Sequence, residues 1–169
     1  MKIVGIDPGS VHLGWGFIET QEGGSDIIRV DAGVLKAPAK LPFYERITRL
    51  GALLSERLQE LDPDCAVIEK IFLGKSVDSA FKLGHIRGVC VAECLRQGAV
   101  VTEYAARKVK KQITGQGNAE KALVQSLLFR QLGLRVQAQS FDASDALALA
   151  FCHVLLDSVE TKNRRMGLL

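Results

Sequence analysis

Residues 1–19, MKIVGIDPGSVHLGWGFIE, place an acid at the end of an apolar run and follow it at once with a tight turn. The apolar residues 3–6 are typical of a buried strand, which Asp7 and the following Pro-Gly pair would end. A second, mostly apolar run follows around Trp15. Because a desolvated carboxylate is costly unless something pairs with it, Asp7 is either a turn residue or a group that holds a ligand.

The spacing of apolar residues beyond this stretch predicts alternating strands and helices. Strands are expected at 2–7, 13–19 and 26–35, joined by turn-forming residues as in an antiparallel meander. Apolar residues recur at three- and four-residue steps over 43–61, which predicts an amphipathic helix. The almost wholly apolar runs 65–69 and 99–104 are typical of buried strands. Further helices are expected at 76–97, 118–132 and 141–159, with a short basic helix after residue 104.

This order of elements predicts the fold class. It is that of a mixed α/β sheet, an antiparallel meander extended by parallel strands and flanked by helices, as in the ribonuclease H-like fold. We find no repeat and no long linker, so residues 1–157 are expected to form a single domain and residues 158–169 a C-terminal tail.

Composition limits the classes of protein to which the chain can belong. With 169 residues, 47% hydrophobic and 24% charged, it has the composition of a globular domain with a sizeable core. No apolar run approaches the roughly 18 residues that span a bilayer, and Asp7 interrupts any signal peptide, so a cytoplasmic protein without a membrane partner is expected. The four cysteines lack the spacing of a zinc site and are expected to be buried free thiols.

Four acids stand where strands end or a helix begins. Asp7 ends the first expected strand, Glu69 ends the run CAVIE, and Asp142 and Asp145 open the last helix. Each has an ordinary structural explanation, as a turn residue, a surface strand end, or an acid that stabilises a helix N-terminus. Taken together they indicate a site, because the carboxyl ends of neighbouring parallel strands meet at one edge, where α/β proteins bind ligands.

Converging carboxylates require a cation. Two like charges 4 Å apart repel by about 4 kcal/mol at an effective dielectric of 20, and no internal cation is evident beside the four acids. All-oxygen ligands favour Mg²⁺, or Mn²⁺ in its place, over zinc. Two such ions about 4 Å apart can activate a water and stabilise both oxygens of a phosphoryl displacement. The acids therefore indicate phosphodiester hydrolysis, with no serine or cysteine nucleophile.

The chain resembles the RuvC family of Holliday-junction resolvases in four stretches that together reach across about residues 1–157. These are GIDPGSVHLGWG (5–16), VIEKIFLGKSVDSAFKLGHIRG (67–88), TEYAARKVKKQITGQGNAEKALV (102–124) and FDASDALALAFCH (141–153). The resemblance implies a homodimeric Mg²⁺-dependent endonuclease that nicks two strands of like polarity in a four-way DNA junction, and a RuvA–RuvB branch-migration complex as partner. It also implies that Asp7, Glu69, Asp142 and Asp145 are the catalytic metal ligands, although some members have His at the position of Asp142.

The same resemblance implies contacts to DNA. Phe72 matches an aromatic residue that meets unpaired bases, and base stacking on an aromatic ring contributes about 1–3 kcal/mol; a core position is equally open. Basic residues of the third stretch resemble a phosphate-binding patch, and a glycine pair before the helix expected near residue 118 could offer N–H groups to phosphate. The DNA-contacting residues expected are Phe72, Lys75, Lys110, Lys111, Gly115, Gly117 and Lys121.

Small residues recur at four-residue steps on the helix expected at 76–97. They are Ala80, Gly84, Gly88 and Ala92, and they predict either a dimer interface or close packing within the chain.

Three other interpretations remain open. The first stretch also resembles the phosphate loop of ATPases and sugar kinases, which need two such domains. A related resolvase-like family implicated in ribosomal RNA processing shares the fold and the first acid. A junction-binding protein without catalysis is the third, although all four acids are present.

Overall fold

The computed structural model describes residues 1–21, 26–70, 77–134 and 140–165, the stretch 160–165 as backbone alone. The strands are β1 (Lys2–Asp7), β2 (His12–Thr20), β3 (Ile27–Lys36), β4 (Cys65–Glu69) and β5 (Val100–Tyr104). The helices are α1 (Phe43–Leu61), α2 (Val77–Arg96), α3 (Ala106–Thr114), α4 (Lys121–Gln131) and α5 (Phe141–Arg165). These bounds confirm the predicted elements, with two differences at helix ends. The helix α4 begins at Lys121 rather than near residue 118, and α5 continues to Arg165 rather than ending near residue 159.

The described strands form one mixed sheet in the order β3-β2-β1-β4-β5. The pairs β1–β2 and β2–β3 are antiparallel, and β1–β4 and β4–β5 are parallel. The expected mixed α/β sheet is therefore confirmed. The prediction that 99–104 forms a buried strand is wrong in one respect, because β5 lies at the sheet edge and Val100 is 67% exposed.

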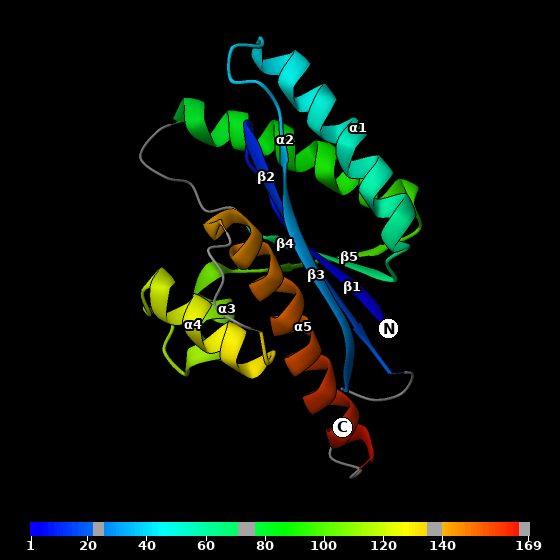
Figure 1. The fold of residues 1–169 in the computed structure, drawn as a ribbon, viewed down its shortest axis with the longest axis vertical. Coiled ribbons are helices and arrows are strands. Elements are labelled where there is room, and N and C mark those ends of the chain that lie inside the picture. Colours follow the sequence, from blue (N-terminus) through cyan, green and yellow to red (C-terminus); the bar gives the residue numbers. More distant parts are fainter. Residues whose placement is uncertain (22–25, 71–76, 135–139, 166–169) are drawn as a thin grey trace.

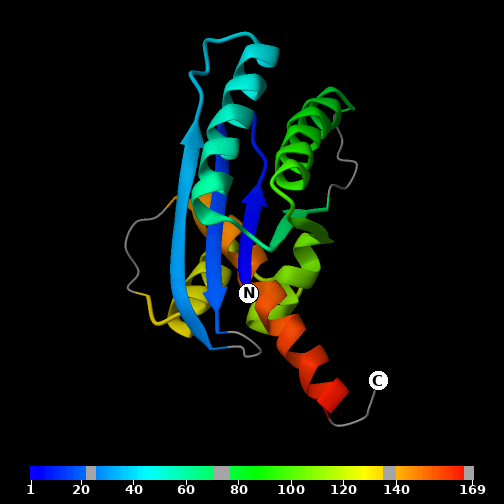
Figure 2. The ribbon, with the colours of Figure 1, turned by 90° about the vertical axis from the view of Figure 1, so that its right-hand side faces the viewer.

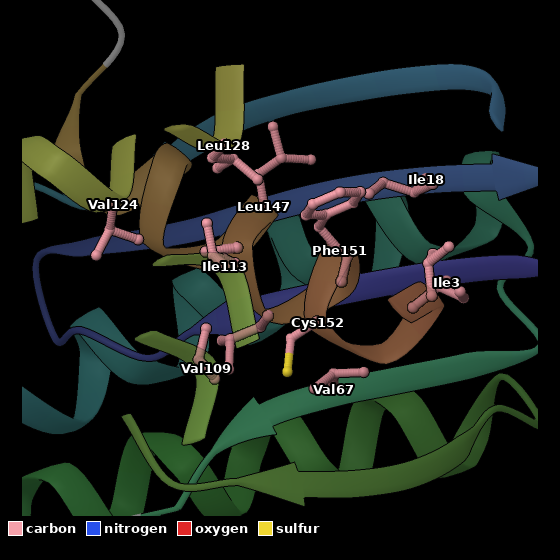
Figure 3. Close-up of a cluster of buried hydrophobic side chains, with 14 of the residues drawn as sticks. Ile3, Ile18, Val67, Val109, Ile113, Val124, Leu128, Leu147, Phe151 and Cys152 are labelled. Carbon is pink, nitrogen blue, oxygen red and sulfur yellow. The ribbon is translucent and has the colours of Figure 1, made fainter. Parts of the chain in front are cut away.

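Helices cover both faces of the sheet (Figures 1 and 2). The long helix α5 crosses one face, with α3 and α4 beside it, while α1 and α2 pack on the other. Successive residues of β1 serve opposite layers, since Ile3 belongs to the core beneath α5 and Val4 to the core beneath α1 and α2. Figure 3 shows the first of these cores, where Phe151 and Cys152 of α5 lie over Ile3 and Val67 of the sheet.

Glycines in the sheet let the main chain of α5 contact the main chain of the strands beneath it. A Cβ at Gly5 would lie 1.9 Å from the carbonyl oxygen of Ala146, and one at Gly14 would lie 2.1 Å from that of Asp142. Real Cβ atoms do not approach main-chain oxygens this closely, so both positions require glycine. The helix therefore rests on the backbone of β1 and β2.

Two further expectations can be compared with the structure. The four cysteines are buried and free, as expected. Within the described part of the chain, none of the helices has the length and apolar character to cross a membrane.

Candidate active site

The sheet topology brings Asp7 and Glu69 to one edge. Asp7 is the last residue of β1 and Glu69 the last of β4, and these parallel strands are neighbours, with Ile6 opposite Ile68. The next residue along each strand therefore emerges at the same end of the sheet, as the positions of the acids in the sequence predict.

The N-terminal turns of α5 carry Asp142 and Asp145 to the same place. Gly14 pairs with Asp7 across β1 and β2, and it is also the glycine on which the carbonyl of Asp142 rests. One residue of β2 thus fixes the distance between the end of β1 and the start of α5. Asp142 and Asp145 are both partly buried there, three residues apart on the helix.

The electrostatics of Asp7 show that the four acids act on one another. Burial, followed by the charges of Asp145, Glu69 and Asp142, raises the pKa of Asp7 to about 7. The pKa of Glu69 is also raised, first by burial and then by the charge of Asp145. Both shifts mean that ionising this cluster is unfavourable without an added positive charge.

Lys121 supplies a positive charge that the sequence did not reveal. Its ammonium donates a 2.5 Å hydrogen bond to Oδ2 of Asp145, and this bond is the main reason that the pKa of Lys121 is raised. The expectation that the cluster has no internal cation is therefore wrong. Lys121 opens α4, which docks on the start of α5 a second time where Gln125 Nε2 donates a 3.1 Å bond to Ser144 Oγ.

The donor set suits a hard divalent cation, although the carboxylates are spaced more widely than ligands around a bound ion. Carboxylate oxygens are the ligands that Mg²⁺ and Mn²⁺ prefer. Burial first, and then the negative charge of the neighbouring acids, raises the pKa of Asp7, and a bound cation would offset that charge. Among residues that the structure describes, no three His, Cys, Asp or Glu side chains lie close enough to enclose a metal ion. Coordination would therefore require the acids to draw together and Asp145 to exchange Lys121 for the ion.

A pocket adjoins the acids between α3, α4 and α5. Glu69, Asp145, Lys110 and Lys121 contribute charged groups to its lining. The remaining lining is apolar and comprises Ala106, Val109, Val124, Ala148 and Leu149. The two lysines give this pocket positive charge that can attract an anion next to the acids.

The other residues expected to contact DNA have varied surroundings. Lys110 donates a 2.7 Å hydrogen bond to the carbonyl of Ala119, whereas Lys111 is exposed. Gly115 caps the end of α3 with φ 80°. Because α4 begins at Lys121, neither Gly115 nor Gly117 belongs to its first turn, which corrects the expected helix N-terminus. Phe72 and Lys75 lie outside the described residues.

Two further groups border the acids, and sequence reasoning missed both. The imidazole Nδ1 of His12 lies 4.0 Å from Oδ2 of Asp142. Tyr104 pairs with Glu69 across β4 and β5, and its hydroxyl is hydrogen-bonded at 2.8 Å to His153 of α5, whose pKa burial lowers. A histidine just after the turn at Asp7 was the available signal for the first group. The second has none, because strand β5 and helix α5 meet only in the fold.

Comparison with known proteins assigns the family. The model of the family described as crossover junction endodeoxyribonuclease RuvC matches residues 3–153. The RuvC of Bdellovibrio bacteriovorus is 46% identical over 153 residues, which is 90% of this chain and 89% of that protein. The RuvC of Chloroflexus aggregans is 40% identical over 154 residues, which is 90% of this chain and 92% of that protein.

A solved structure agrees with these matches. T. thermophilus RuvC in complex with Holliday junction substrate superposes with a TM-score of 0.85 and 29% identity, covering 95% of this chain and 97% of that one. The matched region contains the mixed sheet, all five helices in large part, and the four acids at its edge. The chain therefore belongs to the RuvC family of crossover junction endodeoxyribonucleases.

Proposed function

We propose that the chain resolves Holliday junctions by nicking two strands of like polarity through Mg²⁺-dependent phosphodiester hydrolysis, in homologous recombination and DNA repair. Membership of a nuclease family and the similarity to a junction-bound relative support the substrate. The single observation that carries the chemistry is the group of four carboxylates at one sheet edge, where burial, and then the charges of the other three, raises the pKa of Asp7 to about 7. Such a group is suited to binding cations beside a phosphodiester.

The proposed ligands of Mg²⁺, or of Mn²⁺ in its place, are Asp7, Glu69, Asp142 and Asp145. When bound, two ions would activate a water and stabilise the charge that develops on the attacking and leaving oxygens. The chain's own contribution is to hold the acids on rigid elements, Asp7 and Glu69 at strand ends and Asp142 and Asp145 on α5. Lys121 holds Asp145 at the mouth of the site.

Two of the proposed DNA contacts line the pocket beside the acids. Lys121 and Lys110 line the pocket next to Glu69 and Asp145, and the exposed Lys111 follows on α3. Their charge would attract the phosphates that flank the bond to be cut. Phe72 and Lys75 remain proposed contacts on the resemblance. The expected role of Gly115 and Gly117 is to offer N–H groups at a helix start, but the N–H of Gly115 donates a 2.8 Å hydrogen bond to the carbonyl of Lys111, so of the two Gly117 remains the proposed contact of this kind.

A homodimer is proposed through the outer face of α2, which is defined here by Phe81, Gly84, Gly88 and Leu95. Phe81 is 67% and Leu95 is 58% exposed, and a Cβ at either glycine would meet nothing within 4 Å. An apolar face with open glycines is suited to close helix packing, and a twofold dimer would present two sites to a twofold junction. Cooperation with a RuvA–RuvB complex and a cytoplasmic location complete the proposal.

The experiment that tests the function is a nicking assay on a synthetic four-way junction with mapped cut sites, with and without Mg²⁺. Asp7→Asn and Glu69→Gln should abolish nicking and leave junction binding intact. Glu56→Gln is the matched control, because Glu56 is an exposed acid on α1. Symmetric cuts by the wild type and the control support the proposal. Tight binding without cleavage in Mg²⁺ or Mn²⁺ would show a junction-binding protein, and nicking by Asp7→Asn would refute the metal site.

A further inference from the structure

The loop that follows Asp7 is short and tightly held. Residues 8–11 join β1 to β2, and a Cβ at Gly9 would lie 2.1 Å from the carbonyl oxygen of His12. At the end of this loop, the N–H of Ala37 donates a 3.0 Å hydrogen bond to the carbonyl of Val11. The loop is therefore tied to the segment that follows β3.

Arg46 of α1 holds the middle of the same loop. Its Nε donates a 3.0 Å hydrogen bond to the carbonyl of Ser10. Its Nη1 donates to the carbonyls of Ala39 at 3.0 Å and Leu41 at 2.9 Å. One guanidinium thus joins the loop after β1, the loop after β3 and the first turns of α1.

The chemistry of this contact requires arginine. A planar guanidinium presents donors in a fixed fork, and a charged donor bonds a carbonyl more strongly than a neutral one does. The Lys ammonium has its donors on one atom at the end of a flexible stem, so it cannot span carbonyls on separate loops with the same geometry. The face of the Phe43 ring, whose centroid is 5.8 Å from Cζ, also restricts the guanidinium of Arg46.

The position of Asp7 depends on the loop of residues 8–11. The register of β1 with β4 ends at Ile6 opposite Ile68, one residue before Asp7, whereas Asp7 still pairs with Gly14 of β2. Beyond Asp7 the chain enters the loop at once. The direction of the Asp7 carboxylate is therefore set by one strand neighbour and by the conformation of residues 8–11.

We infer that Arg46 is a positioning residue for Asp7, which fixes the loop at Ser10 and so keeps the carboxylate at the end of β1 in register with Glu69 and α5. The inference rests on the proposed function, in which Asp7 is a metal ligand. The side-chain hydrogen bonds of Arg46 to described residues go to main-chain carbonyls, so it acts through the main chain of residues 8–11. Its loss is expected to affect the chemical step and the response to Mg²⁺ more than the affinity for DNA.

The test compares Arg46→Ala and Arg46→Lys with Arg49→Ala. Arg49 is exposed on α1, one turn beyond Arg46, so its loss removes the same charge from the same helix. We expect Arg46→Ala to lower the single-turnover nicking rate by about tenfold to 100-fold, as misplaced catalytic groups do, and to raise the Mg²⁺ concentration for half-maximal rate. Junction affinity should stay within about twofold, and Arg46→Lys should fall between Arg46→Ala and the wild type, because it keeps the charge without the fork.

Amide hydrogen exchange at residues 9–12 provides a readout independent of activity. Exchange there should quicken in both Arg46 variants and stay unchanged in Arg49→Ala. If Arg46→Ala is poorly folded, Arg46→Lys decides the question with the same measurements. Unchanged rate, Mg²⁺ response and loop exchange in Arg46→Lys, or equal losses in Arg49→Ala, would overturn the inference. Asp7→Asn, assayed alongside, separates failure of the proposed metal site from failure of the positioning role of Arg46, since nicking by that variant refutes the metal site itself.

Discussion

The ammonium of Lys121 lies 2.5 Å from Oδ2 of Asp145 and joins the first turn of α4 to the first turns of α5. The charges of Asp7 and Glu69 act on the same ammonium, and together with Asp145 they raise its pKa. One lysine therefore offsets part of the repulsion among four clustered acids, and any divalent cation that binds Asp145 must compete with it.

Replacing Lys121 with Met should lower stability most where no divalent cation is present. The side chain of Lys121 is 62% exposed, so solvent screens the pair, and the midpoint of thermal unfolding in EDTA should fall by at most about 3 °C. Mg²⁺ should raise that midpoint more in the variant than in the wild type, because the competing ammonium is gone. Lys111→Met is the control, and an equal Mg²⁺ effect in all three proteins would contradict this prediction.

The raised pKa of Asp7 predicts how stability depends on pH. The ordinary pKa of an Asp carboxyl is 3.8 and the pKa of Asp7 in the folded protein is about 7, so the folded state binds more protons between these limits. Stability contributed by this group is therefore present at low pH and lost as pH rises from about 4 to about 7. The shift corresponds to at most about 4 kcal/mol.

Asp7→Asn removes this dependence. In urea unfolding, the free energy of unfolding of the variant should exceed that of the wild type at pH 8, and the two values should be equal near pH 4. Glu56→Gln, which changes an exposed acid on α1, should follow the wild type at both values. If the free energy of unfolding of Asp7→Asn depends on pH as that of the wild type does, the prediction is contradicted, because ionising Asp7 would then cost the folded protein no stability.

Gly14→Ala should separate α5 from the sheet. The added Cβ would lie 2.1 Å from the carbonyl oxygen of Asp142, and because that atom belongs to the main chain, the first turn of α5 must move. We expect the free energy of unfolding to fall by about 1–3 kcal/mol, as in other overpacked cores. We expect the nicking rate to fall by more than this loss of stability alone would cause. Unfolding in denaturant and the junction assay measure the two, and nicking at the wild-type rate would contradict the role of Gly14.

Charge on the outer face of α2 should dissociate the proposed dimer. Phe81→Glu places an acid on this face, and Leu123→Glu places one at a 43% exposed position on α4 as a control. Light scattering should give the monomer mass for the first and the wild-type mass for the second. In the junction assay, Phe81→Glu should make single cuts in place of paired ones.

Lys111→Ala should weaken junction binding and reduce the slope of log affinity against log salt by about one. Lys111 is exposed on α3 and follows Lys110, which lines the pocket beside the acids. Lys82→Ala, on α2, is the control, because Lys82 already pairs with Asp78. The same slope in Lys111→Ala and the wild type would argue against the contact.

Much of the fold could be predicted because it depends on local periodicity. Apolar periodicity, turn residues and chain order predict the strand end at Asp7 and the helix 43–61. They also predict the parallel pairing of the two runs that end at Asp7 and Glu69. The exposure of Val100 could not be predicted, since a short apolar run does not reveal whether its strand is central or at an edge.

The site was predictable only in its acids. Asp7 and Glu69 mark strand ends, and Asp142 and Asp145 mark a helix start, so their convergence follows from topology. The bond of Lys121 to Asp145 and the bond of Arg46 to the carbonyl of Ser10 join residues that are 24 and 36 positions apart in the chain. Such contacts leave no periodic pattern, because they depend on how α4 and α1 pack against their neighbours.

The contact of α5 with Gly5 and Gly14 determines which substitutions the core of this chain can accept without moving the acids. Where a helix packs on side chains, every core substitution changes its height above the sheet. Here main-chain atoms set that height at both contacts, so neighbouring core side chains can be exchanged while Asp142 and Asp145 keep their level relative to Asp7. The geometry of the proposed metal site is therefore expected to tolerate changes in the core around it.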